Sequence, residues 1–120
     1  MYIDKDLVAA SATPLVLGIL AEGESYGYAI LQRVEDLSGG EIQWSDGMLY
    51  PLLHRLERLG LVTSSWGRSD SGRRRKHYAI TDAGRDTLAV RRSQWEAMAG
   101  MLDQVWRSAQ RPPSAATGWA

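Results

Sequence analysis

The stretch that decides the fold is SDGMLYPLLHRLERLG, residues 45–60, near the middle of the chain. Its leucines recur at the spacing of one face of an α-helix, and that face comprises Leu49, Leu52, Leu53, Leu56 and Leu59. Ser45 stands where the helix begins and Gly60 where it ends, which are favoured positions for a capping serine and a terminating glycine. The pattern therefore predicts an amphipathic helix with a buried leucine face.

The opposite face of this helix carries a selected set of groups. At 100° per residue, the following residues lie within about 60° of the Gly47 position: Tyr50, Pro51, His54 and Arg58, with Arg55 at the margin. A phenol, an imidazole and a guanidinium on an exposed helix can reach base edges or phosphates from a major groove, which is about 12 Å wide. Pro51 removes one helical hydrogen bond and predicts an irregular first turn or a bend.

A β-hairpin is predicted directly after this helix. LVTSSW (61–66) favours a strand, GRSDSG (67–72) is rich in turn residues, and RRRKHYAIT (73–81) contains a second strand pattern. Alternation places Tyr78 and Ile80 toward the core, and Trp66 is expected to anchor the hairpin to the body. Near the tip both faces are cationic, through Arg73, Arg74, Arg75 and Lys76. Such a tip favours contact with phosphates or a minor groove, and the alternative is a solvated charge cluster.

Two helical patterns precede the central stretch. Residues 4–22 are apolar nearly all round, so this helix needs two surfaces to pack against, one of which can belong to another chain. Thr13 followed by Pro14 can cap a second helix start, which predicts a kink or a split. The next helix is expected to begin with Ser25 as its N-cap and to end at residues 38–40. Its apolar face comprises Ile30, Leu31, Val34 and Leu37.

The last helix is predicted from Thr81, as N-cap, to about residue 109. Its apolar positions follow a coiled-coil-like seam that is interrupted at Arg91 and Arg92. Because a small domain cannot easily cover this seam alone, we expect a homodimer interface formed by Leu88, Met98, Leu102, Val105 and Trp106. Residues 110–120 are rich in Pro, Ser, Ala and Gly and are expected to form a disordered tail.

Composition narrows the function classes. The chain has 120 residues, the size of one domain, and its 14 basic and 14 acidic side chains give a formal net charge of zero. The basic excess lies in residues 41–80, which carry seven basic and four acidic side chains. With no Cys and two distant His residues, we expect no metal site and no cofactor. The sequence contains no phosphate loop, nucleophile elbow or paired-carboxylate site, which argues against an enzyme.

The sequence also predicts no association with a membrane. The longest uncharged run, Leu7–Ala21, has 15 residues and contains Pro14. It is shorter than the roughly 20 residues that span a bilayer, and no basic segment precedes it. We therefore expect a cytoplasmic protein.

The order of the expected elements is three helices, a two-stranded hairpin and a long amphipathic helix. This order predicts a mainly α fold with a small β-hairpin (α+β), the winged helix-turn-helix. Residues 1–81 would form a DNA-binding domain with its wing at about 61–80, and residues 82–109 would form a dimerisation helix.

Four short motifs occur in a specific order and spacing: GYAI (27–30), SDGMLYPLLHRLE (45–57), GLV (60–62), and a basic run that leads into YAITDAG (78–84). Together they resemble the PadR family of bacterial transcriptional regulators over about residues 7–107. The short, single C-terminal helix is similar to the branch that includes multidrug-sensing repressors. The resemblance implies a dimer that binds double-stranded DNA at a roughly palindromic operator. The candidate DNA contacts are Tyr28, Ser45, Gly47, Tyr50, His54, Arg55, Arg58, Arg73, Arg74, Arg75 and Lys76.

The resemblance also implies a repressor that responds to a ligand. In such a dimer the last helix packs against the partner's first helix, and one Trp from each subunit sandwiches a planar aromatic effector at the dimer centre. Trp95 matches that position, and the facing wall would comprise Leu7, Ala10, Pro14 and Gly18. Where relatives can carry another aromatic and an acidic residue, this chain has Arg92 and Ala99. An anionic or neutral planar ligand therefore fits at least as well as a cationic drug.

Each interpretation has a rival. Trp95 can be a packing residue of the seam, and Tyr50 can pack over the start of its helix. Ser45 can serve only as a cap, His54 can be an inert surface residue, and Tyr28 can be a core ring with a hydrated hydroxyl. For the function, the rivals are a winged-helix scaffold that binds an acidic protein, and a ligand-binding protein without a dedicated operator.

Overall fold

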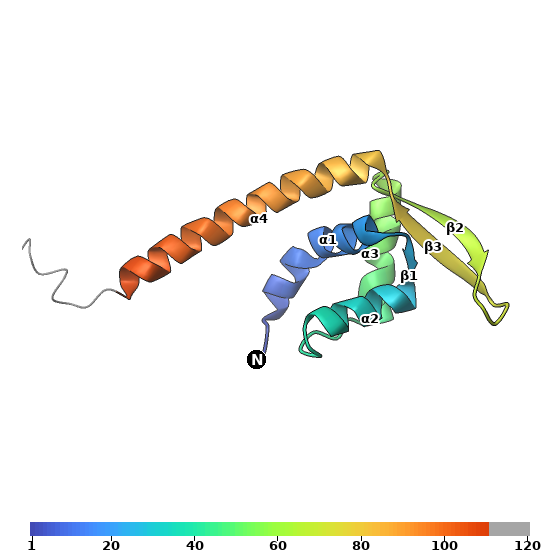
Figure 1. Cartoon of the computed structure of the whole chain (residues 1–120), viewed down its shortest axis with the longest axis horizontal. Coiled ribbons are helices and arrows are strands. Elements are labelled where there is room, and N and C mark those ends of the chain that lie inside the picture. Colours follow the sequence, from blue (N-terminus) through green and yellow to red (C-terminus); the bar gives the residue numbers. More distant parts are fainter. Residues whose placement is uncertain (111–120) are drawn as a thin grey trace, which may run out of the picture. The chain divides into compact units, whose positions relative to one another are not determined.

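The computed structural model describes residues 1–110, in two compact units that comprise Met1–Ala89 and the chain from Val90 onward. The elements in chain order are α1 (Lys5–Glu22), β1 (Ser25–Tyr26), α2 (Gly27–Leu37), α3 (Asp46–Arg58), β2 (Val62–Arg68), β3 (Arg74–Ile80) and α4 (Asp82–Ala109) (Figure 1). The predicted mainly helical fold with a small antiparallel sheet is confirmed. The predicted tail, from residue 111 on, lies outside the described residues.

α1 is a single helix that runs through Pro14, so of the two predicted alternatives at Thr13, a kink or a split, the split does not occur. It begins after Asp4, whose side chain accepts a hydrogen bond from the Asp6 N–H at 2.8 Å. Its buried residues are Ala12, Val16, Leu17, Ile19 and Leu20. Because these side chains pack into the core on both sides of the proline, tertiary packing holds the helix together across the hydrogen bond that Pro14 cannot make.

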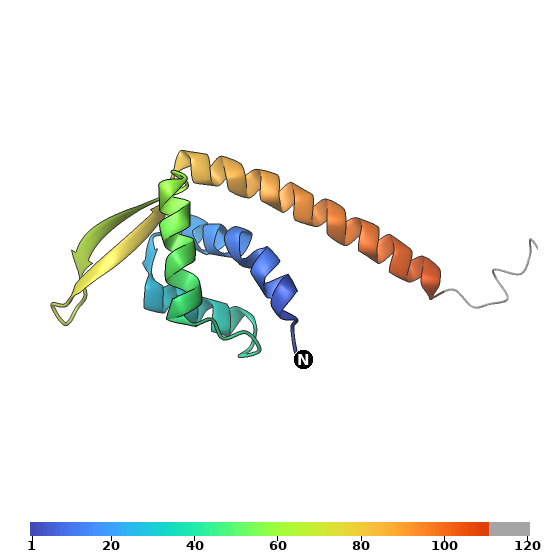
Figure 2. The ribbon, with the colours of Figure 1, turned by 180° about the vertical axis from the view of Figure 1, so that it is seen from behind.

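The predicted hairpin forms with strands slightly displaced from the expected ranges. β2 and β3 pair in antiparallel register from Val62 opposite Ile80 to Arg68 opposite Arg74. Figures 1 and 2 show the two strands projecting together from the three helices, as a wing.

A third strand, β1, was not predicted. It lies on the other side of β3, where Ser25 pairs with Tyr78 and Tyr26 with His77. Ser25 is therefore part of a strand and does not cap α2, which begins after Tyr26 without a side-chain cap. A strand of two residues shows no alternation, so the sequence pattern could not reveal it.

α3 begins where the sequence predicted, because the Ser45 hydroxyl oxygen accepts a hydrogen bond from the Met48 N–H at 3.2 Å. Its buried residues are Leu49, Leu52, Leu53 and Leu56. Leu59 was expected on this face but is 63% exposed, because it follows the last helical residue and the chain turns at Gly60. Leu37 is exposed for a similar reason, since it is the last residue of α2.

The core of the Met1–Ala89 unit forms between the first three helices and the sheet. Tyr78 of β3 is the largest fully buried side chain, which confirms its predicted inward orientation. Around it the core comprises Leu17, Leu20, Ile30, Val34, Leu49, Leu53, Leu56 and Val62, among others. Ile80 is half-buried and packs against this cluster. The sheet and α3 are thereby held together at the base of the wing.

A hydrogen-bonded joint connects α3, β2 and the start of α4. The Thr81 hydroxyl donates to the Gly60 carbonyl oxygen at 2.6 Å and accepts from the Gly84 N–H at 3.0 Å, which confirms Thr81 as the cap. The Thr81 N–H donates to the Leu61 carbonyl oxygen at 3.0 Å. A Cβ atom at Gly84 would collide with that same oxygen, so glycine allows the backbone of α4 to approach β2.

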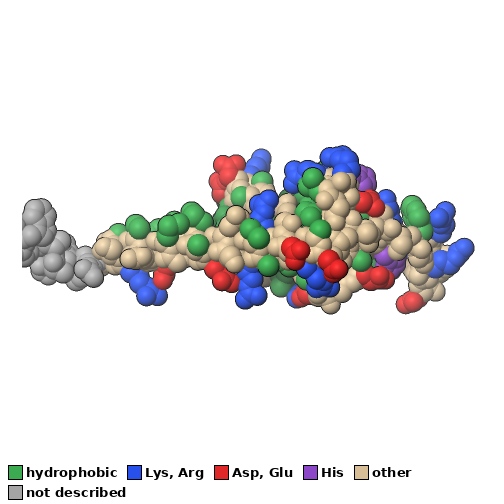
Figure 3. All heavy atoms as spheres, turned by 90° about the horizontal axis from the view of Figure 1, so that it is seen from above, with side chains coloured by type: hydrophobic (Ala, Val, Ile, Leu, Met, Phe, Trp, Pro, Cys, Tyr) green, Lys and Arg blue, Asp and Glu red, His purple; other side chains and the backbone are tan. Residues whose placement is uncertain are grey.

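From Val90 onward α4 continues as one amphipathic helix. Figure 3 shows hydrophobic side chains along one edge of this part and charged side chains along the other. Two ion pairs lie on the charged side, Arg92 with Glu96 at 2.7 Å and Arg107 with Asp103 at 2.9 Å. The exposed hydrophobic residues are Val90, Trp95, Met98, Met101, Leu102, Val105 and Trp106. Within residues 1–110, the structure contains no helix with the length and apolar character needed to cross a membrane.

Candidate nucleic-acid interface

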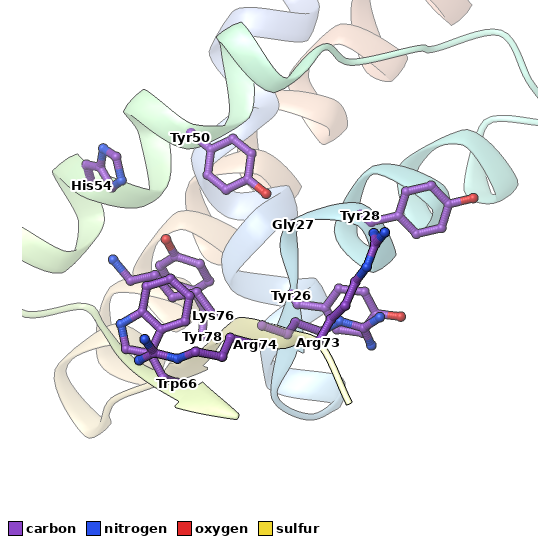
Figure 4. Close-up of a pocket in the computed structure, with 11 residues that line it drawn as sticks. Tyr26, Gly27, Tyr28, Tyr50, His54, Trp66, Arg73, Arg74, Lys76 and Tyr78 are labelled. Carbon is purple, nitrogen blue, oxygen red and sulfur yellow. The ribbon is translucent and has the colours of Figure 1, made fainter. Parts of the chain in front are cut away.

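A groove of about 660 Å³ lies between the wing, the start of α2 and the exposed face of α3 (Figure 4). Aromatic and cationic residues line it: Tyr26, Gly27, Tyr28, Tyr50, His54, Trp66, Arg73, Arg74, Arg75, Lys76 and Tyr78. Among the described residues, the lining includes four Arg and Lys side chains and no carboxylate. The groove therefore favours an anionic ligand.

Tyr50 and His54 lie one turn apart on α3, facing the groove opposite the wing (Figure 4). The Tyr50 ring also lies directly against Gly27, the first residue of α2, where a Cβ atom would collide with the phenol oxygen. Tyr50 is 36% exposed, so part of the ring packs on α2 while the rest remains available in the groove. Glycine at position 27 thus allows the two helices of the helix-turn-helix to approach each other closely.

Four other predicted DNA contacts lie outside the groove lining. Arg55 Nη2 donates a hydrogen bond to the Thr13 hydroxyl of α1 at 3.4 Å, and Arg58 is exposed. The Ser45 hydroxyl is used as the cap of α3, and Gly47 is exposed in the first turn. Their roles toward DNA remain predictions.

Three of the four wing cations lie over aromatic rings. The guanidinium carbon of Arg75 is 3.7 Å from the ring centroid of Tyr26, that of Arg74 is 4.7 Å from Trp66, and Lys76 Nζ is 5.7 Å from Tyr78. Each such contact contributes about 0.5–1 kcal/mol at exposed sites and about 2 kcal/mol when desolvated. A guanidinium that stacks on a ring keeps its N–H donors in its own plane, where they can still bind phosphate oxygens.

Trp66 does not anchor the wing to the body, contrary to the prediction, because it is 61% exposed. It shares a face of β2 with the buried Val62, but it lies four residues farther along the strand, beyond the core. Its ring contacts Arg74 instead. The strand pattern gave the correct face, but it could not show where the body of the domain ends.

Tyr78 forms a neutral floor of the groove. Its side chain is 1% exposed, and its hydroxyl has no hydrogen-bond partner among residues 1–110. Burial, reinforced by the nearby Glu57 and Tyr50, raises the pKa of Tyr78 above its usual value of 10. Glu57 of α3 accepts a hydrogen bond from the Ser64 hydroxyl of β2. Because its pKa is raised, the Tyr78 phenol stays protonated at neutral pH and adds no negative charge to the groove.

The structure brings seven of the predicted DNA contacts into one groove: Tyr28, Tyr50, His54, Arg73, Arg74, Arg75 and Lys76. Sequence reasoning missed four further lining residues, namely Tyr26, Gly27, Trp66 and Tyr78. Strand alternation places Trp66 and Tyr78 on the same face of the hairpin, so it could have identified both as lining residues. Tyr26 gave no such signal because β1 was not recognised.

The residues assigned to the effector and to the dimer lie in both compact units. In the Met1–Ala89 unit, Leu7 and Ala10 are exposed, Pro14 and Gly18 are half-buried, and Leu88 packs against the core. In the rest of α4, Trp95 is 36% exposed. In the part of the chain that the structure describes, no three His, Asp or Glu side chains are placed to share a metal ion. The effector and dimer assignments remain predictions.

Comparison with known proteins agrees with this geometry. The model of the transcriptional regulator PadR-like family matches residues 16–90. The chain is 39% identical over 84 residues to the transcriptional regulator Rv3488 of Mycobacterium tuberculosis, covering 70% of this chain and 75% of that protein. It is 33% identical over 82 residues to the transcriptional regulator YqjI of Escherichia coli, covering 68% of this chain but 38% of that protein.

A solved structure shows the same fold. The PadR family transcriptional regulator from Eggerthella lenta superimposes with a TM-score of 0.73 at 33% identity, over 84% of this chain and 86% of that one. The family model covers more than half of the chain, and the similarity to Rv3488 extends over three quarters of that regulator. The chain therefore belongs to the PadR-like family of transcriptional regulators.

Proposed function

We propose that this chain acts as a dimeric, sequence-specific DNA-binding repressor that a planar aromatic effector releases. The observation that supports DNA binding is the groove between α3 and the wing, which joins an exposed helix face to four cations. DNA is a dense polyanion, and cations that neutralise its phosphates supply much of the affinity of its protein partners. No enzymatic role is part of the proposal.

The two sides of the groove suit two parts of a duplex. The exposed face of α3 would enter the major groove, where Tyr50, His54 and Arg58 can reach base edges. The wing cations would contact phosphates or the adjacent minor groove. Two subunits would engage half-sites about one helical turn apart, which is roughly 34–36 Å.

Dimerisation would cover the hydrophobic edge of α4. Six large side chains on this edge are exposed in the described chain, namely Trp95, Met98, Met101, Leu102, Val105 and Trp106. Burial of a half-exposed side chain of this size contributes about 1 kcal/mol. The combined contribution of the twelve such side chains in a dimer is therefore comparable to the roughly 4–15 kcal/mol that association costs. Size-exclusion chromatography with light scattering measures the oligomeric state directly.

An effector would act between the subunits, stacked on Trp95. It would reposition the last helices and change the spacing of the two α3 helices, and so lower the affinity for DNA. A coupling of about 1–3 kcal/mol is typical of such responses and is sufficient for derepression. Arg92 is ion-paired with Glu96 at 2.7 Å, so an anionic effector would compete with that carboxylate for the guanidinium.

The DNA upstream of this gene provides the first test. A labelled duplex is titrated with the wild type and with a variant in which Arg73, Arg74, Arg75 and Lys76 are replaced by Gln, against a scrambled competitor. We expect selective binding by the wild type and at least tenfold weaker binding by the variant.

A matched variant controls for net charge. Replacing Arg85, Arg91, Arg92 and Arg107 by Gln removes the same charge outside the groove and should leave selective binding within about threefold. Equal loss in both variants would mean that only total charge matters. A wild type without preference for any genomic duplex would favour the protein-interaction scaffold.

A further inference from the structure

Two aromatic rings in the groove between α3 and the wing keep most of their surface open to solvent. Trp66 of β2 is 61% exposed and Tyr28 of α2 is 70% exposed, and both line the groove (Figure 4). Tyr50 of α3 adds a third, partly exposed ring. A partner that enters the groove therefore meets accessible ring surfaces as well as cations.

Contacts within the described chain occupy little of these two rings. Arg74 lies over Trp66, with its guanidinium carbon 4.7 Å from the ring centroid, and the high exposure of Trp66 leaves the other face of the indole open. Among residues 1–110, no cation lies over the ring of Tyr28. Each residue thus offers a flat apolar face that folding has not covered.

A paired duplex cannot stack on these faces. In double-stranded DNA each base pair lies between its neighbours, so that a protein reaches the base edges and the backbone. An unpaired strand exposes the faces of its bases. Proteins that bind single strands combine a positively charged groove with aromatic side chains on which the bases stack. The open rings of Trp66 and Tyr28 beside the wing cations form this combination.

The cations stand next to the rings, where the backbone of a strand needs them. Trp66 is directly opposite Lys76 in the register of the hairpin, and Arg73 and Arg74 line the same groove. Because a phosphate adjoins every nucleoside of a strand, a base stacked on Trp66 brings its phosphates close to these side chains. The volume of about 660 Å³ is large enough for a ligand of the size of a nucleotide.

We propose that this groove also binds single-stranded DNA. One base stacks on the open face of Trp66, another stacks on Tyr28, and the wing cations bind the phosphates. This activity goes beyond the function proposed above, because it needs no operator, no dimer and no effector. A single strand and a duplex would compete for the same groove.

Fluorescence anisotropy with the full-length protein tests the proposal by comparing two labelled strands. One is an oligothymidylate of about 15 nucleotides, and the other has the same length and phosphates but abasic sites in place of the bases. We expect the wild type to bind the oligothymidylate about tenfold more tightly, because only this strand has bases that can stack.

Paired substitutions separate stacking from charge. Trp66→Leu and Tyr28→Leu each remove a ring without changing the net charge, and each should weaken binding of the oligothymidylate about tenfold. Trp66→Phe and Tyr28→Phe keep a ring and should stay within about threefold of the wild type. Both positions are exposed, so we expect all four variants to fold, which circular dichroism verifies.

Three results would overturn the proposal. The first is no binding of the oligothymidylate, and the second is equal affinity for the two strands, which would mean that only phosphates are bound. The third is wild-type affinity in either folded leucine variant. Neither strand contains an operator, so the outcome does not depend on the proposed function. Ring-dependent binding of the strand without selective binding of any duplex would leave this proposal standing and refute the proposed function.

Discussion

Replacing Tyr78 by Phe should make the protein more stable, although the residue lies in the core. The side chain is 1% exposed, and its hydroxyl has no partner among the described residues. An unsatisfied buried polar group costs about 1–3 kcal/mol, whereas the small void left by one oxygen costs less than about 1 kcal/mol. We expect the free energy of unfolding to rise by about 1 kcal/mol, which is about 4–8 °C in Tm for a domain of this size.

The same substitution should change the response to alkaline pH. Because burial raises the pKa of Tyr78 in the folded protein, the unfolded chain loses this phenol proton first, near pH 10. The folded state then binds more protons than the unfolded state, so this contribution to stability is lost as the pH rises above about 10. The Tyr78→Phe variant lacks this phenol, so its free energy of unfolding should fall less than that of the wild type as the pH rises above about 10.

Urea unfolding at fixed protein concentration, followed by circular dichroism, measures both effects. The wild type and Tyr78→Phe are compared at about pH 7 and pH 10.5, with Tyr28→Phe as the control. Tyr28 is 70% exposed, so its hydroxyl should change stability by less than about 0.5 kcal/mol. If Tyr78→Phe is less stable than the wild type by about 1 kcal/mol or more at pH 7, the hydroxyl forms a stabilising hydrogen bond and the reasoning is refuted.

Three other substitutions have distinct expected results. Gly84→Ala should lower the free energy of unfolding by about 1–3 kcal/mol, because its Cβ atom would meet the backbone oxygen of Leu61; an unchanged Tm would contradict this packing. Trp66→Ala should leave stability within about 0.5 kcal/mol, since the residue is exposed, but it should weaken operator binding about two- to fivefold in fluorescence anisotropy through the lost stacking on Arg74. Equal operator affinities would show that this stacking has no role. Trp95→Ala should reduce effector-induced release of DNA and leave operator affinity within about twofold; loss of both to the same extent would assign Trp95 to packing.

The elements that the sequence predicted best are those with local periodicity. Buried leucines repeat within α3, and turn residues separate the strands of the wing, so both signals lie within short stretches. The cations and the polar face of α3 could be identified for the same reason. The wing cations and the polar face of α3 line the same groove because of two contacts between segments that are distant in the sequence. These are the pairing of β1 with β3 and the packing of Tyr50 on Gly27.

Three of the wrong predictions concern residues toward the ends of elements. Leu59 and Leu37 continue the apolar spacing of their helices, but each stands where its helix ends, and its side chain therefore lies beyond the buried face. Trp66 continues the inward face of β2 beyond the body that would cover it. Periodicity indicates which side of an element is apolar, whereas the extent of the neighbouring elements decides how far that side is buried.

The rings beneath Arg74, Arg75 and Lys76 restrict the rotamers of these side chains before any partner is bound. A long side chain that becomes immobile only on association costs about 0.5–1.5 kcal/mol of conformational entropy. For three such side chains this is about 1.5–4.5 kcal/mol, or about one to three orders of magnitude in affinity. In the wing, folding has already imposed much of this ordering. Tyr26, Trp66 and Tyr78 would therefore strengthen the proposed binding of DNA by preorganising the cations, without themselves having to touch the duplex.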